Sequence, residues 1–459
     1  MVIKTKKKYK TYMKSMNTLI QKYNRPAPRY TSYPPVPFWN ERPCETTWIG
    51  HLKDSYSEMR GVDLYVHIPF CESLCYYCGC NRTITKNHGV EEKYLGMILK
   101  EWNLYKEKLG FTPKINSLHF GGGTPTFLSA ETLDRLINQL LENKSEFFIG
   151  SIEIDPRRVN KEQLAVCKKY GITRISLGIQ DFNPDVQKSI NRLQSPELVE
   201  DLVETIRAEK FESLNFDLIY GLPKQTLDSI HKTFQIVSDL RPDLIAFYSY
   251  AHLPDKIKNQ KFIKETELPT PEEKRALYNE GKKILEEIGY VEIGMDHFAL
   301  PGSFLSLAMK NFKLQRNFMG YVDRKSNILL GLGPTSIADS SLSFMQNEKD
   351  LKKYEERLNK NELPHSNGHT HSREDLIIQN ILQQLMCQQQ VDFGETNEIP
   401  FWMEIEKELL EFQEDGLLVF NVDKMQISPL GKSFIRNIAL AFDFHHRTKT
   451  TGAKFSQTI

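Results

Sequence analysis

The sequence has no long hydrophobic run: no stretch approaches the ~18 apolar residues of a membrane-spanning helix. It has no apolar leader either, because Met1 to Leu19 is mostly polar. It also lacks an excess of charge of one sign, since 60 Lys and Arg residues face 59 Asp and Glu residues, which leaves a net charge of +1. These absences argue against a membrane span and against a global field that would hold nucleic acid, and they predict a cytoplasmic protein.

Cysteine is scarce, with seven residues in 459, but four of them fall between Cys71 and Cys80. An odd number in so tight a cluster is a poor disulfide framework. The spacing Cys71-x3-Cys75-x2-Cys78 is instead typical of a 4Fe–4S site, in which three thiolates hold three irons and leave one iron open. Structural zinc is the alternative, but it requires four ligands, usually as two separated pairs, and a second pair is missing.

An open iron can chelate the amino and carboxylate groups of S-adenosylmethionine (SAM), and an electron from the reduced cluster can then cleave the sulfonium to a carbon radical. A fourth cysteine ligand would close that iron. We therefore expect Cys80 to be a non-ligand with another role, or a packed thiol. Tyr77, between the ligands, could lie against an adenine, although core packing is an equally common role for such a ring.

Short apolar, β-branched runs alternate with longer amphipathic stretches in the middle of the chain. This alternation predicts about six parallel strands that are buried on both faces, in an α/β sheet that is open or closed into a barrel. The predicted strands are Val62–Ile68, Ile115–Phe120, Ser151–Ile154, Arg174–Gly178, Leu214–Ile219 and Leu244–Tyr248, and the clearest predicted helices are Glu91–Lys108, Ala130–Glu142 and Lys161–Tyr170.

Each predicted strand ends in a loop rich in Gly, Pro or polar residues, and the active sites of such sheets lie at the carboxyl ends of the strands. The first loop contains the cysteines. The second contains three glycines, at positions 121 to 123, whose missing side chains let a ligand approach the backbone closely. Polar residues at or just after later strand ends are candidate anchors for a nucleoside and a carboxylated substrate; they are Glu153, Gln180, Arg192 and Asp217.

Beyond the sheet, Thr270 to Glu273 (TPEE) is a capping box that should begin a helix running to about Ile288. The charged stretch Glu348–Asn367 favours a boundary. The last part of the chain looks separate, with helices predicted near Arg373–Gln389 and Phe401–Asp415, then a short hairpin, then a helix from Lys432.

Six motifs carry a resemblance to a known family: YVHIPFCESLCYYCGCN, FGGGTPTFLS, SIEIDPRRV, LGIQDFNPDVQKSINRLQ, NFDLIYGLPKQT and YAHLP. With them the chain resembles, nearly from end to end, the oxygen-independent coproporphyrinogen III oxidases (dehydrogenases) of porphyrin biosynthesis, in the radical SAM superfamily. The resemblance implies a partial (β/α)6 barrel of parallel strands with an N-terminal arm and a mainly helical C-terminal domain. The implied domains are 1–44, an arm covering the active site; 45–355, the radical SAM catalytic barrel; and 356–459, the mainly helical domain.

The resemblance implies an oxidoreductase that converts two propionate side chains of coproporphyrinogen III to vinyls, giving protoporphyrinogen IX for haem biosynthesis without oxygen. A 5′-deoxyadenosyl radical starts each decarboxylation. The implied cofactors are one 4Fe–4S cluster, with Cys71, Cys75 and Cys78 as metal ligands, and two SAM molecules. The implied partners are a low-potential electron donor and an electron acceptor of unknown identity. We expect a monomer that binds no nucleic acid.

The resemblance also assigns residues to both SAM molecules. The first is assigned to Tyr65, Gly122, Glu153 and Ile337, and the second to Tyr77, Gly123, Thr124, Gln180, Arg192, Asp217 and Ala251. Catalytic roles are assigned to Cys80, Tyr65 and Glu153. The family commonly has Phe where this chain has Tyr77, so stacking survives and a hydroxyl group is added.

Two relatives compete with this interpretation. A haem-chaperone branch keeps the three-cysteine loop, but it typically has an aromatic residue where this chain has Cys80, and it lacks the segment Arg29 to Tyr33 (RYTSY). Haem-opening radical SAM methyltransferases share the loop and GGGTP, but not the full-length match. We also predict that Arg29 helps to hold the tetrapyrrole, because its fork suits a propionate carboxylate; the alternative is that the arm only packs on the barrel.

Overall fold

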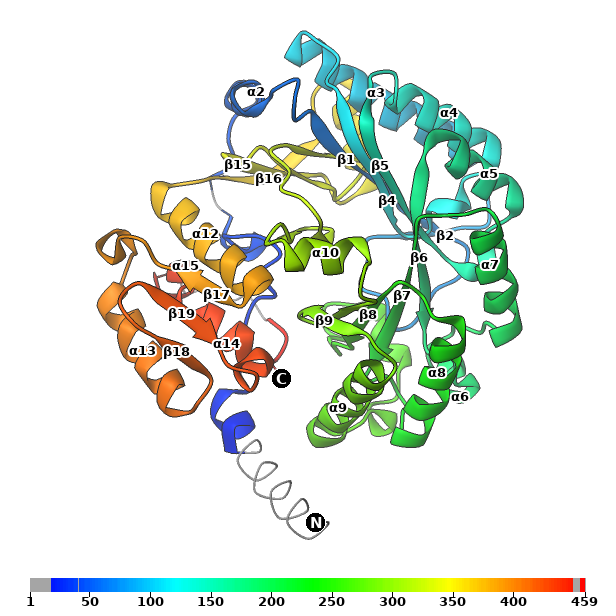
Figure 1. The fold of residues 1–459 in the computed structure, drawn as a ribbon. Helices are drawn as coiled ribbons and strands as arrows, with labels where there is room; N and C mark the ends of the chain where they lie inside the picture. Colours follow the sequence, from blue (N-terminus) through cyan, green and yellow to red (C-terminus); the bar gives the residue numbers. More distant parts are fainter. Residues whose placement is uncertain (1–17, 40, 449–454, 459) are drawn as a thin grey trace. The chain divides into compact units, whose positions relative to one another are not determined.

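The computed structural model describes residues 18–39, 41–448 and 455–458. The chain divides into two compact units, each assembled from separate stretches of sequence. The larger unit consists of Asn40–Ser306 and Lys325–Thr370, and the smaller unit consists of Met1–Trp39, Leu307–Arg324 and His371–Ile459. All residues that the sequence assigns to the cluster and to SAM lie in the larger unit (Figure 1).

A mixed sheet runs through the larger unit, and within the described residues it has twelve strands. Seven adjacent strands are parallel, in the order β13-β1-β4-β5-β6-β7-β8. Six of them are the predicted strands in chain order, which confirms the parallel α/β fold. The outermost strands, β16 and β9, do not pair with each other, so the barrel is partial. The bounds of the six strands are β1 Val62–Ile68, β4 Ile115–Gly122, β5 Lys144–Ile154, β6 Ile172–Gln180, β7 Ser213–Tyr220 and β8 Leu244–Ser249.

Successive residues of each strand point to opposite faces of the sheet. In β1, Leu64, Val66 and Ile68 are fully buried in the core of the larger unit, so Tyr65 and His67 point to the other face, where the site forms. The connecting helices lie along the outer side of the sheet (Figure 1), as crossover connections between parallel strands require. These helices are α3 Val90–Leu109, α4 Ala130–Leu140, α5 Lys161–Tyr170, α6 Pro184–Ser189, α7 Pro196–Ala208, α8 Leu227–Leu240 and α9 Pro271–Glu287.

The capping box predicted at Thr270 is present at the start of α9. The Thr270 side chain accepts a hydrogen bond from the Glu273 backbone N–H, and the Glu273 side chain accepts one from the Thr270 backbone N–H. The helix ends at Glu287, one residue before the predicted end. Two otherwise unpaired N–H groups are satisfied in this way, which explains why local sequence was sufficient to predict this helix.

Short strands that the sequence analysis did not predict extend the sheet at both edges. They are the parallel strand β13 Leu329–Leu332, the antiparallel strands β14 Ile337–Asp339, β15 Ser343–Asn347 and β16 His365–Thr370 beyond it, and β10 His297–Ala299 and β9 Val291–Gly294 at the opposite edge. The stretch Glu348–Asn367, which favoured a boundary, contains helix α11 (Leu351–Asn359) and the start of β16. An edge strand has a neighbour on one side only, so polar residues are tolerated there.

The smaller unit contains the helices and the hairpin predicted for the end of the chain, and it is mainly helical, as predicted. The bounds are α12 Arg373–Gln388, β17 Gln390–Asp392, α13 Trp402–Glu414, β18 Leu418–Phe420, β19 Lys424–Ile427, α14 Ile435–Ala441 and α15 Phe444–Thr448. No helix in the described part of the chain is both long and apolar enough to cross a membrane. The domain boundaries, and the role of residues 1–44 over the active site, stay predictions.

Candidate active site

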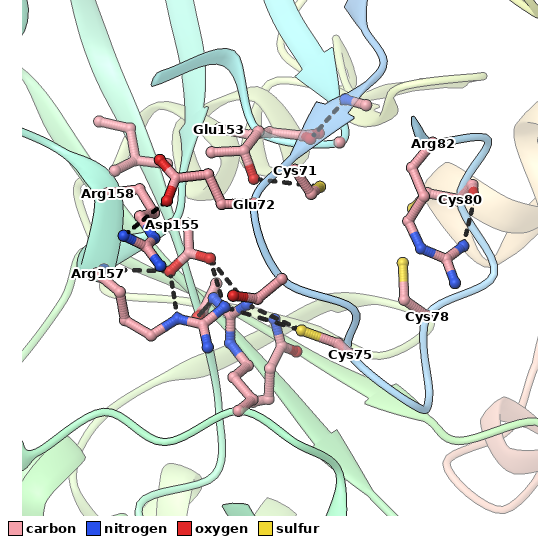
Figure 2. A pocket seen from close by; sticks show the side chains of 18 of the residues that line it. Cys71, Glu72, Cys75, Cys78, Cys80, Arg82, Glu153, Asp155, Arg157 and Arg158 are labelled. Carbon is pink, nitrogen blue, oxygen red and sulfur yellow. Dashed lines mark hydrogen bonds and ion pairs between the residues drawn. The ribbon is translucent and has the colours of Figure 1, made fainter. Parts of the chain in front are cut away.

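A cavity of about 190 Å³ opens at the carboxyl ends of β1, β4, β5, β6 and β7 (Figure 2). This is the edge of the sheet at which the sequence predicted a site. Twelve of the predicted residues line the cavity: Cys71, Cys75, Tyr77, Cys78, Cys80, Gly122, Gly123, Thr124, Glu153, Gln180, Arg192 and Asp217. Residues from five separate strand–loop junctions therefore meet around one space.

Three predicted residues are not among those that line the cavity. Tyr65 lies on β1 with its hydroxyl group against His67, Ile337 begins β14, and the Ala251 carbonyl accepts a hydrogen bond from Gln260 at 3.0 Å. The cavity is also lined by charged residues that the sequence analysis did not single out: Glu72, Arg82, Asp155, Arg157 and Arg158. The run Asp-Pro-Arg-Arg directly after β5 is the sequence pattern that could have identified three of them, Asp155, Arg157 and Arg158.

The cysteine loop leaves β1 and passes through the short strand β2 (Phe70–Cys71), which pairs with β3 (Thr83–Ile84). Cys75 is buried, and Cys71 and Cys78 are half-buried. None of the chain's seven cysteines, all of which the structure describes, is in a disulfide. Three unpaired thiols on one loop around one cavity are the donor set that an iron–sulfur cluster requires. The residues present therefore fit the cluster that the sequence predicted.

Two neighbouring amides hold the backbone of the cysteine loop. Both belong to a short 3-10 helix, Lys258–Phe262. The Asn259 side-chain amide donates to the carbonyls of Cys75 at 3.1 Å, Tyr76 at 2.8 Å and Cys78 at 3.0 Å. The Gln260 side-chain amide donates to the Tyr77 carbonyl at 3.0 Å. The backbone between Cys75 and Cys78 is thus held by hydrogen bonds from a separate element of the chain.

Hydrogen bonding and burial act differently on the thiols. A side-chain hydrogen bond with Cys80 lowers the pKa of Cys78, and the nearby positive charge of Arg82 lowers it further. Burial raises the pKa of Cys71 to about 11, although the Thr124 hydroxyl, 3.5 Å from Cys71 Sγ, opposes this shift. Cys78 therefore loses its proton more readily than Cys71.

Two glycines allow the second loop to lie against the first. A Cβ atom on Gly123 would lie 2.7 Å from the Phe70 carbonyl oxygen and 3.0 Å from Cys71 Sγ. A Cβ atom on Gly122, which has a φ of +114°, would lie 2.7 Å from the ring of His67. Because any side chain would collide at both positions, only glycine fits between the cysteine loop and β1.

Glu153, at the end of β5, places a half-buried carboxylate in the cavity. Its Oε2 atom accepts from the Gly122 backbone N–H at 3.2 Å, and its Oε1 atom lies 3.3 Å from His119 Nε2. Burial alone would raise the pKa of Glu153, but the hydrogen bond with His119 and the charge of that ring outweigh it, and the net pKa is lowered. The second nitrogen of His119 contacts the Ser151 hydroxyl at 2.7 Å, which orients the ring.

Tyr65 joins this cluster through ring stacking and one hydrogen bond. Its ring lies 5.7 Å from the His119 ring with an interplanar angle of 16°. The Tyr65 hydroxyl lies 3.1 Å from His67 Nδ1, and His67 Nε2 lies 2.9 Å from the Asn81 carbonyl oxygen. A carbonyl can only accept, so His67 donates from Nε2 and its Nδ1 accepts from the tyrosine hydroxyl. Burial lowers the pKa of His67, which keeps the ring neutral.

Asp217, on β7, is the second half-buried acid of the cavity. Burial raises its pKa to about 6, and the charge of Glu153 raises it further, against hydrogen bonds from Ser176 at 3.1 Å and Asn215 at 2.9 Å. Arg192, on the loop after α6, donates to the Gly178 carbonyl and lies 3.3 Å from Asp155. The site therefore holds two acids of different protonation tendency and a buried cation around one space.

One stretch of the chain matches a known superfamily. Residues 65–237 match the Radical SAM superfamily. The matched segment begins on β1 and ends in α8, so it contains the cysteine loop and all the residues that line the cavity. The fold and the site are those of a radical SAM enzyme.

Full-length relatives then give the family. The oxygen-independent coproporphyrinogen III oxidase of Pseudomonas aeruginosa is 37% identical over 96% of this chain and 98% of the relative. That of Helicobacter pylori is 38% identical over 95% of this chain and 98% of the relative. The solved structure of coproporphyrinogen III oxidase from Escherichia coli, described as a radical SAM enzyme, superposes with a TM-score of 0.85 at 35% identity, over 90% of this chain and 97% of that one. The chain belongs to the oxygen-independent coproporphyrinogen III oxidase family of oxidoreductases.

Proposed function

We propose that this protein converts coproporphyrinogen III to protoporphyrinogen IX without oxygen, by oxidative decarboxylation of two propionate side chains to vinyl groups. The observation that carries the proposal is a three-thiol loop at the carboxyl end of a parallel sheet, in a chain aligned over 96% of its length with an enzyme of that name. The name of that relative supports a place in haem biosynthesis, and seven cysteines without a disulfide favour a cytoplasmic protein.

Radical SAM enzymes use a 4Fe–4S cluster and SAM, and we assign the cluster to Cys71, Cys75 and Cys78. When bound and reduced, the cluster supplies the electron that cleaves SAM to the 5′-deoxyadenosyl radical. The chain's own task is to present three thiolates in fixed places. Asn259 holds the loop carbonyls, and the lowered pKa of Cys78, caused first by its hydrogen bond with Cys80, favours the thiolate that binds iron.

The first SAM is assigned to Tyr65, Gly122, Glu153 and Ile337. Glu153 suits this role because its pKa is lowered, chiefly by its hydrogen bond with His119, and an ionised carboxylate attracts the ammonium group of a methionine moiety. Tyr65 stacks on His119 and so helps to fix the ring that holds the carboxylate.

The second SAM is assigned to Tyr77, Gly123, Thr124, Gln180, Arg192, Asp217 and Ala251. A guanidinium group such as that of Arg192 can bind both oxygens of a carboxylate. The raised pKa of Asp217, caused first by burial, favours a carboxyl group that donates as well as accepts hydrogen bonds. Two SAM molecules per chain match two propionate side chains per substrate.

Each vinyl group requires the loss of one hydrogen atom, one carbon dioxide molecule and one electron. The hydrogen atom passes to the 5′-deoxyadenosyl radical, and the electron passes to an acceptor outside the chain. A low-potential donor must supply the electrons that reduce the cluster. We infer a monomer, because twelve of the assigned residues surround one cavity without a contribution from a second chain.

The test is anaerobic reconstitution with iron and sulfide, followed by incubation with coproporphyrinogen III, SAM and a low-potential reductant. We expect about four irons per chain, protoporphyrin after oxidation, and about two 5′-deoxyadenosines per product molecule. Cys75→Ser is the matched control and should lose iron, brown colour and product together. Retention of full iron in Cys75→Ser would contradict the cluster assignment. Tight haem binding without product would instead support the chaperone branch, and a methylated, opened haem would support the methyltransferases.

A further inference from the structure

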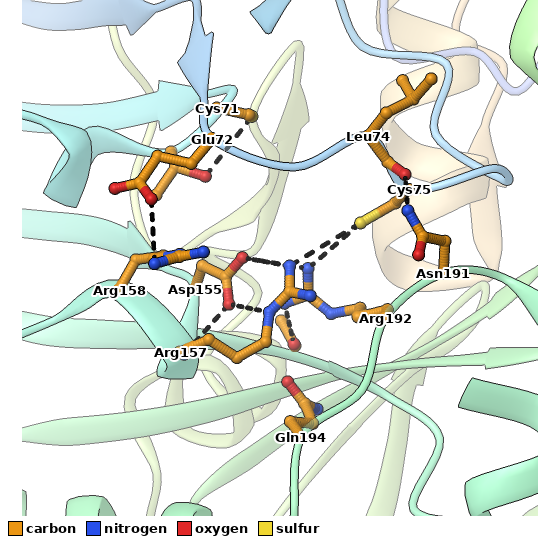
Figure 3. A network of polar contacts seen from close by, with 12 residues as sticks. Cys71, Glu72, Leu74, Cys75, Asp155, Arg157, Arg158, Asn191, Arg192 and Gln194 are labelled. Atoms are coloured by element: carbon orange, nitrogen blue, oxygen red, sulfur yellow. Dashed lines mark hydrogen bonds and ion pairs between the residues drawn. The ribbon is translucent and has the colours of Figure 1, made fainter. Parts of the chain in front are cut away.

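Cys75 differs from the other two thiols in its surroundings, because two guanidinium groups point at its sulfur (Figure 3). Arg157 Nη2 lies 3.8 Å from Cys75 Sγ, and Arg192 Nη1 lies 3.6 Å from it. Arg157 comes from the turn after β5, whereas Arg192 follows α6, so two separate elements converge on one sulfur atom.

Asp155 fixes both guanidinium groups in this orientation. Arg157 binds it with two nitrogens, Nε to Oδ1 at 2.9 Å and Nη2 to Oδ2 at 2.6 Å, and Arg192 Nη1 lies 3.3 Å from the same Oδ2. The side chains of Asp155, Arg157 and Arg192 are 10%, 17% and 7% exposed. Burial would raise the pKa of Asp155, but the charges of Arg192 and Arg157 hold it at about 2, so the carboxylate stays ionised.

The arginine next in sequence provides a contrast. Arg158 lines the same cavity, but it pairs with Glu72 at 2.9 Å, and its side chain is 39% exposed. In Figure 3 the dashed line from Arg158 leads to Glu72 and not to a sulfur atom. Arg157 and Arg158 are therefore two cations on one turn that both pair with an acid, but Arg157 also contacts a proposed cluster ligand.

An N–H donor directed at a ligand sulfur changes the reduction potential of an iron–sulfur cluster. Reduction adds negative charge that is shared by the irons and their thiolates. A buried, charged donor stabilises the reduced form more than the oxidised form, since it interacts with more negative charge, and weak screening in the interior strengthens the effect. The expected consequence is a higher reduction potential, which makes the cluster easier to reduce.

We propose that Arg157, held by Asp155, is a positioning residue that raises the reduction potential of the cluster by donating to Cys75 Sγ. The inference rests on the proposed cluster ligation. It assigns a function to the Asp-Pro-Arg-Arg turn that is separate from SAM binding, because Arg157 is not among the residues assigned to either SAM. Arg192 acts on the same sulfur and also on the second SAM, so Arg157 is the cleaner position for a test.

The experiment is a potentiometric titration of the reconstituted full-length protein, followed by electron paramagnetic resonance and carried out without SAM. For Arg157→Ala we expect unchanged iron content and a cluster about tenfold harder to reduce, a shift of about −59 mV for one electron. Arg157→Lys keeps the charge but not the fork, and its potential should lie between those of the wild type and Arg157→Ala. Arg158→Ala removes the neighbouring cation and should leave the potential close to the wild-type value.

Three results would overturn the proposal: an unchanged potential in Arg157→Ala at full iron content, an equal shift in Arg158→Ala, or a wild-type potential in Arg157→Lys. If Arg157→Ala loses its cluster, the reduction potential of Arg157→Lys, compared with that of the wild type, decides whether the proposal holds. Failure of the proposed function is distinguishable, since it would appear as a wild-type protein that binds the cluster but makes no protoporphyrin, whatever the potentials of the variants.

Discussion

Cys80 shares a hydrogen bond with Cys78, but it is not one of the three proposed cluster ligands. A fourth thiolate would close the iron that SAM needs. We predict that Cys80→Ser keeps its iron and still cleaves SAM, yet makes less porphyrin product. Iron, 5′-deoxyadenosine and protoporphyrin are measured on one preparation. Cys78→Ser is the matched control and should lose both iron and SAM cleavage, whereas iron loss in Cys80→Ser would count against this assignment.

Glu101 on α3 is a buried acid that lies away from the cavity and belongs to the core of the larger unit. Its Oε2 atom accepts from the Gly333 backbone N–H at 2.8 Å and from the Tyr354 hydroxyl at 2.5 Å, and its Oε1 atom accepts from the Asn347 side-chain amide at 2.6 Å. Burial raises its pKa from 4.5 to about 7, although these hydrogen bonds oppose the shift. The native chain therefore holds this proton more tightly than the unfolded chain does.

That difference predicts a pH dependence of stability with a definite sign. The contribution of Glu101 is fully present below about pH 4.5 and is lost as the pH rises through about 7. Relative to Glu101→Gln, we predict that the free energy of unfolding of the wild type falls by about 3 kcal/mol across this window. Urea titrations followed by circular dichroism measure it. Tyr354→Phe removes a hydrogen bond that lowers the pKa of Glu101, so its decline should continue to a higher pH and be larger than that of the wild type; a difference independent of pH would refute the prediction.

Motif residues of the cavity could be predicted from sequence, whereas the residues that act on them could not. Three cysteines at a fixed spacing specify chemistry by themselves. Arg157 was visible only as a charged residue in a loop after a strand, and its partner Cys75 is 82 positions away. The Glu101 contact with Gly333 spans 232 positions. Contacts of this length arise from the topology of the sheet, which local sequence patterns do not record.

The central strands gave clear signals, and strands at the edges did not. Burial on both faces was wrong for β5 and β6, in which buried residues alternate with more exposed ones because one face borders the site. The six central strands consist of apolar, β-branched runs, and β1 was predicted with its observed bounds, Val62–Ile68. The strand β14 has only three residues and β13 only four, so neither shows a period. β13 becomes a strand because Leu329 to Leu332 pair with β1 across the sheet. The sequence predicts elements that are stable through their own pattern and misses those that depend on a partner.

The short 3-10 helix Lys258–Phe262 is the element that holds the cysteine loop, and we predict that Asn259→Ala weakens cluster retention. Its amide contacts three loop carbonyls with two N–H groups. Removing them costs about 2 kcal/mol, which corresponds to iron release to a chelator roughly 30-fold faster. Release is followed by the loss of the brown absorbance in the presence of an iron chelator.

A neighbouring position provides the control for this prediction. Lys258 is exposed and lies one residue earlier on the same helix, so Lys258→Ala should release iron at the wild-type rate. Gln260→Ala, which loses the contact with the Tyr77 carbonyl, should show an intermediate rate. Equal rates of iron release in Asn259→Ala and Lys258→Ala would show that the hydrogen bonds from Asn259 to the cysteine loop do not limit cluster loss.

The two compact units are each assembled from stretches that are far apart in the sequence. The smaller unit takes in Leu307–Arg324 as well as both ends of the chain. A boundary drawn along the sequence follows changes in composition, and it has no means of grouping an inserted segment with the C-terminus. The structure was therefore needed to assign residues to the two units, whereas the mainly helical character of the last part could be predicted from the sequence.

In the smaller unit, one buried arginine joins the two ends of the chain. Arg436, 5% exposed, donates from Nε to the Pro28 carbonyl at 3.1 Å and from Nη1 to the Gln457 carbonyl at 2.6 Å. It also donates to the carbonyls of Ala27 and Ser456. Because a single guanidinium group satisfies carbonyls from both ends, the N-terminal arm and the C-terminal segment should be released together when it is removed.

We predict that Arg436→Ala exposes both ends to protease at once. Each hydrogen bond from a charged donor contributes about 1.5–3 kcal/mol, so the loss of several leaves the arm poorly held. Brief chymotrypsin digestion with mass spectrometry should show faster cleavage near Tyr30 and near Phe455 in this variant. Arg373→Ala, an exposed position of the same unit whose side chain is 73% accessible, should digest like the wild type. Release of one end alone would show that Arg436 does not couple them. If the arm also contributes to the proposed site, as the prediction for Arg29 requires, protoporphyrin yield should fall in Arg436→Ala while iron content and SAM cleavage persist.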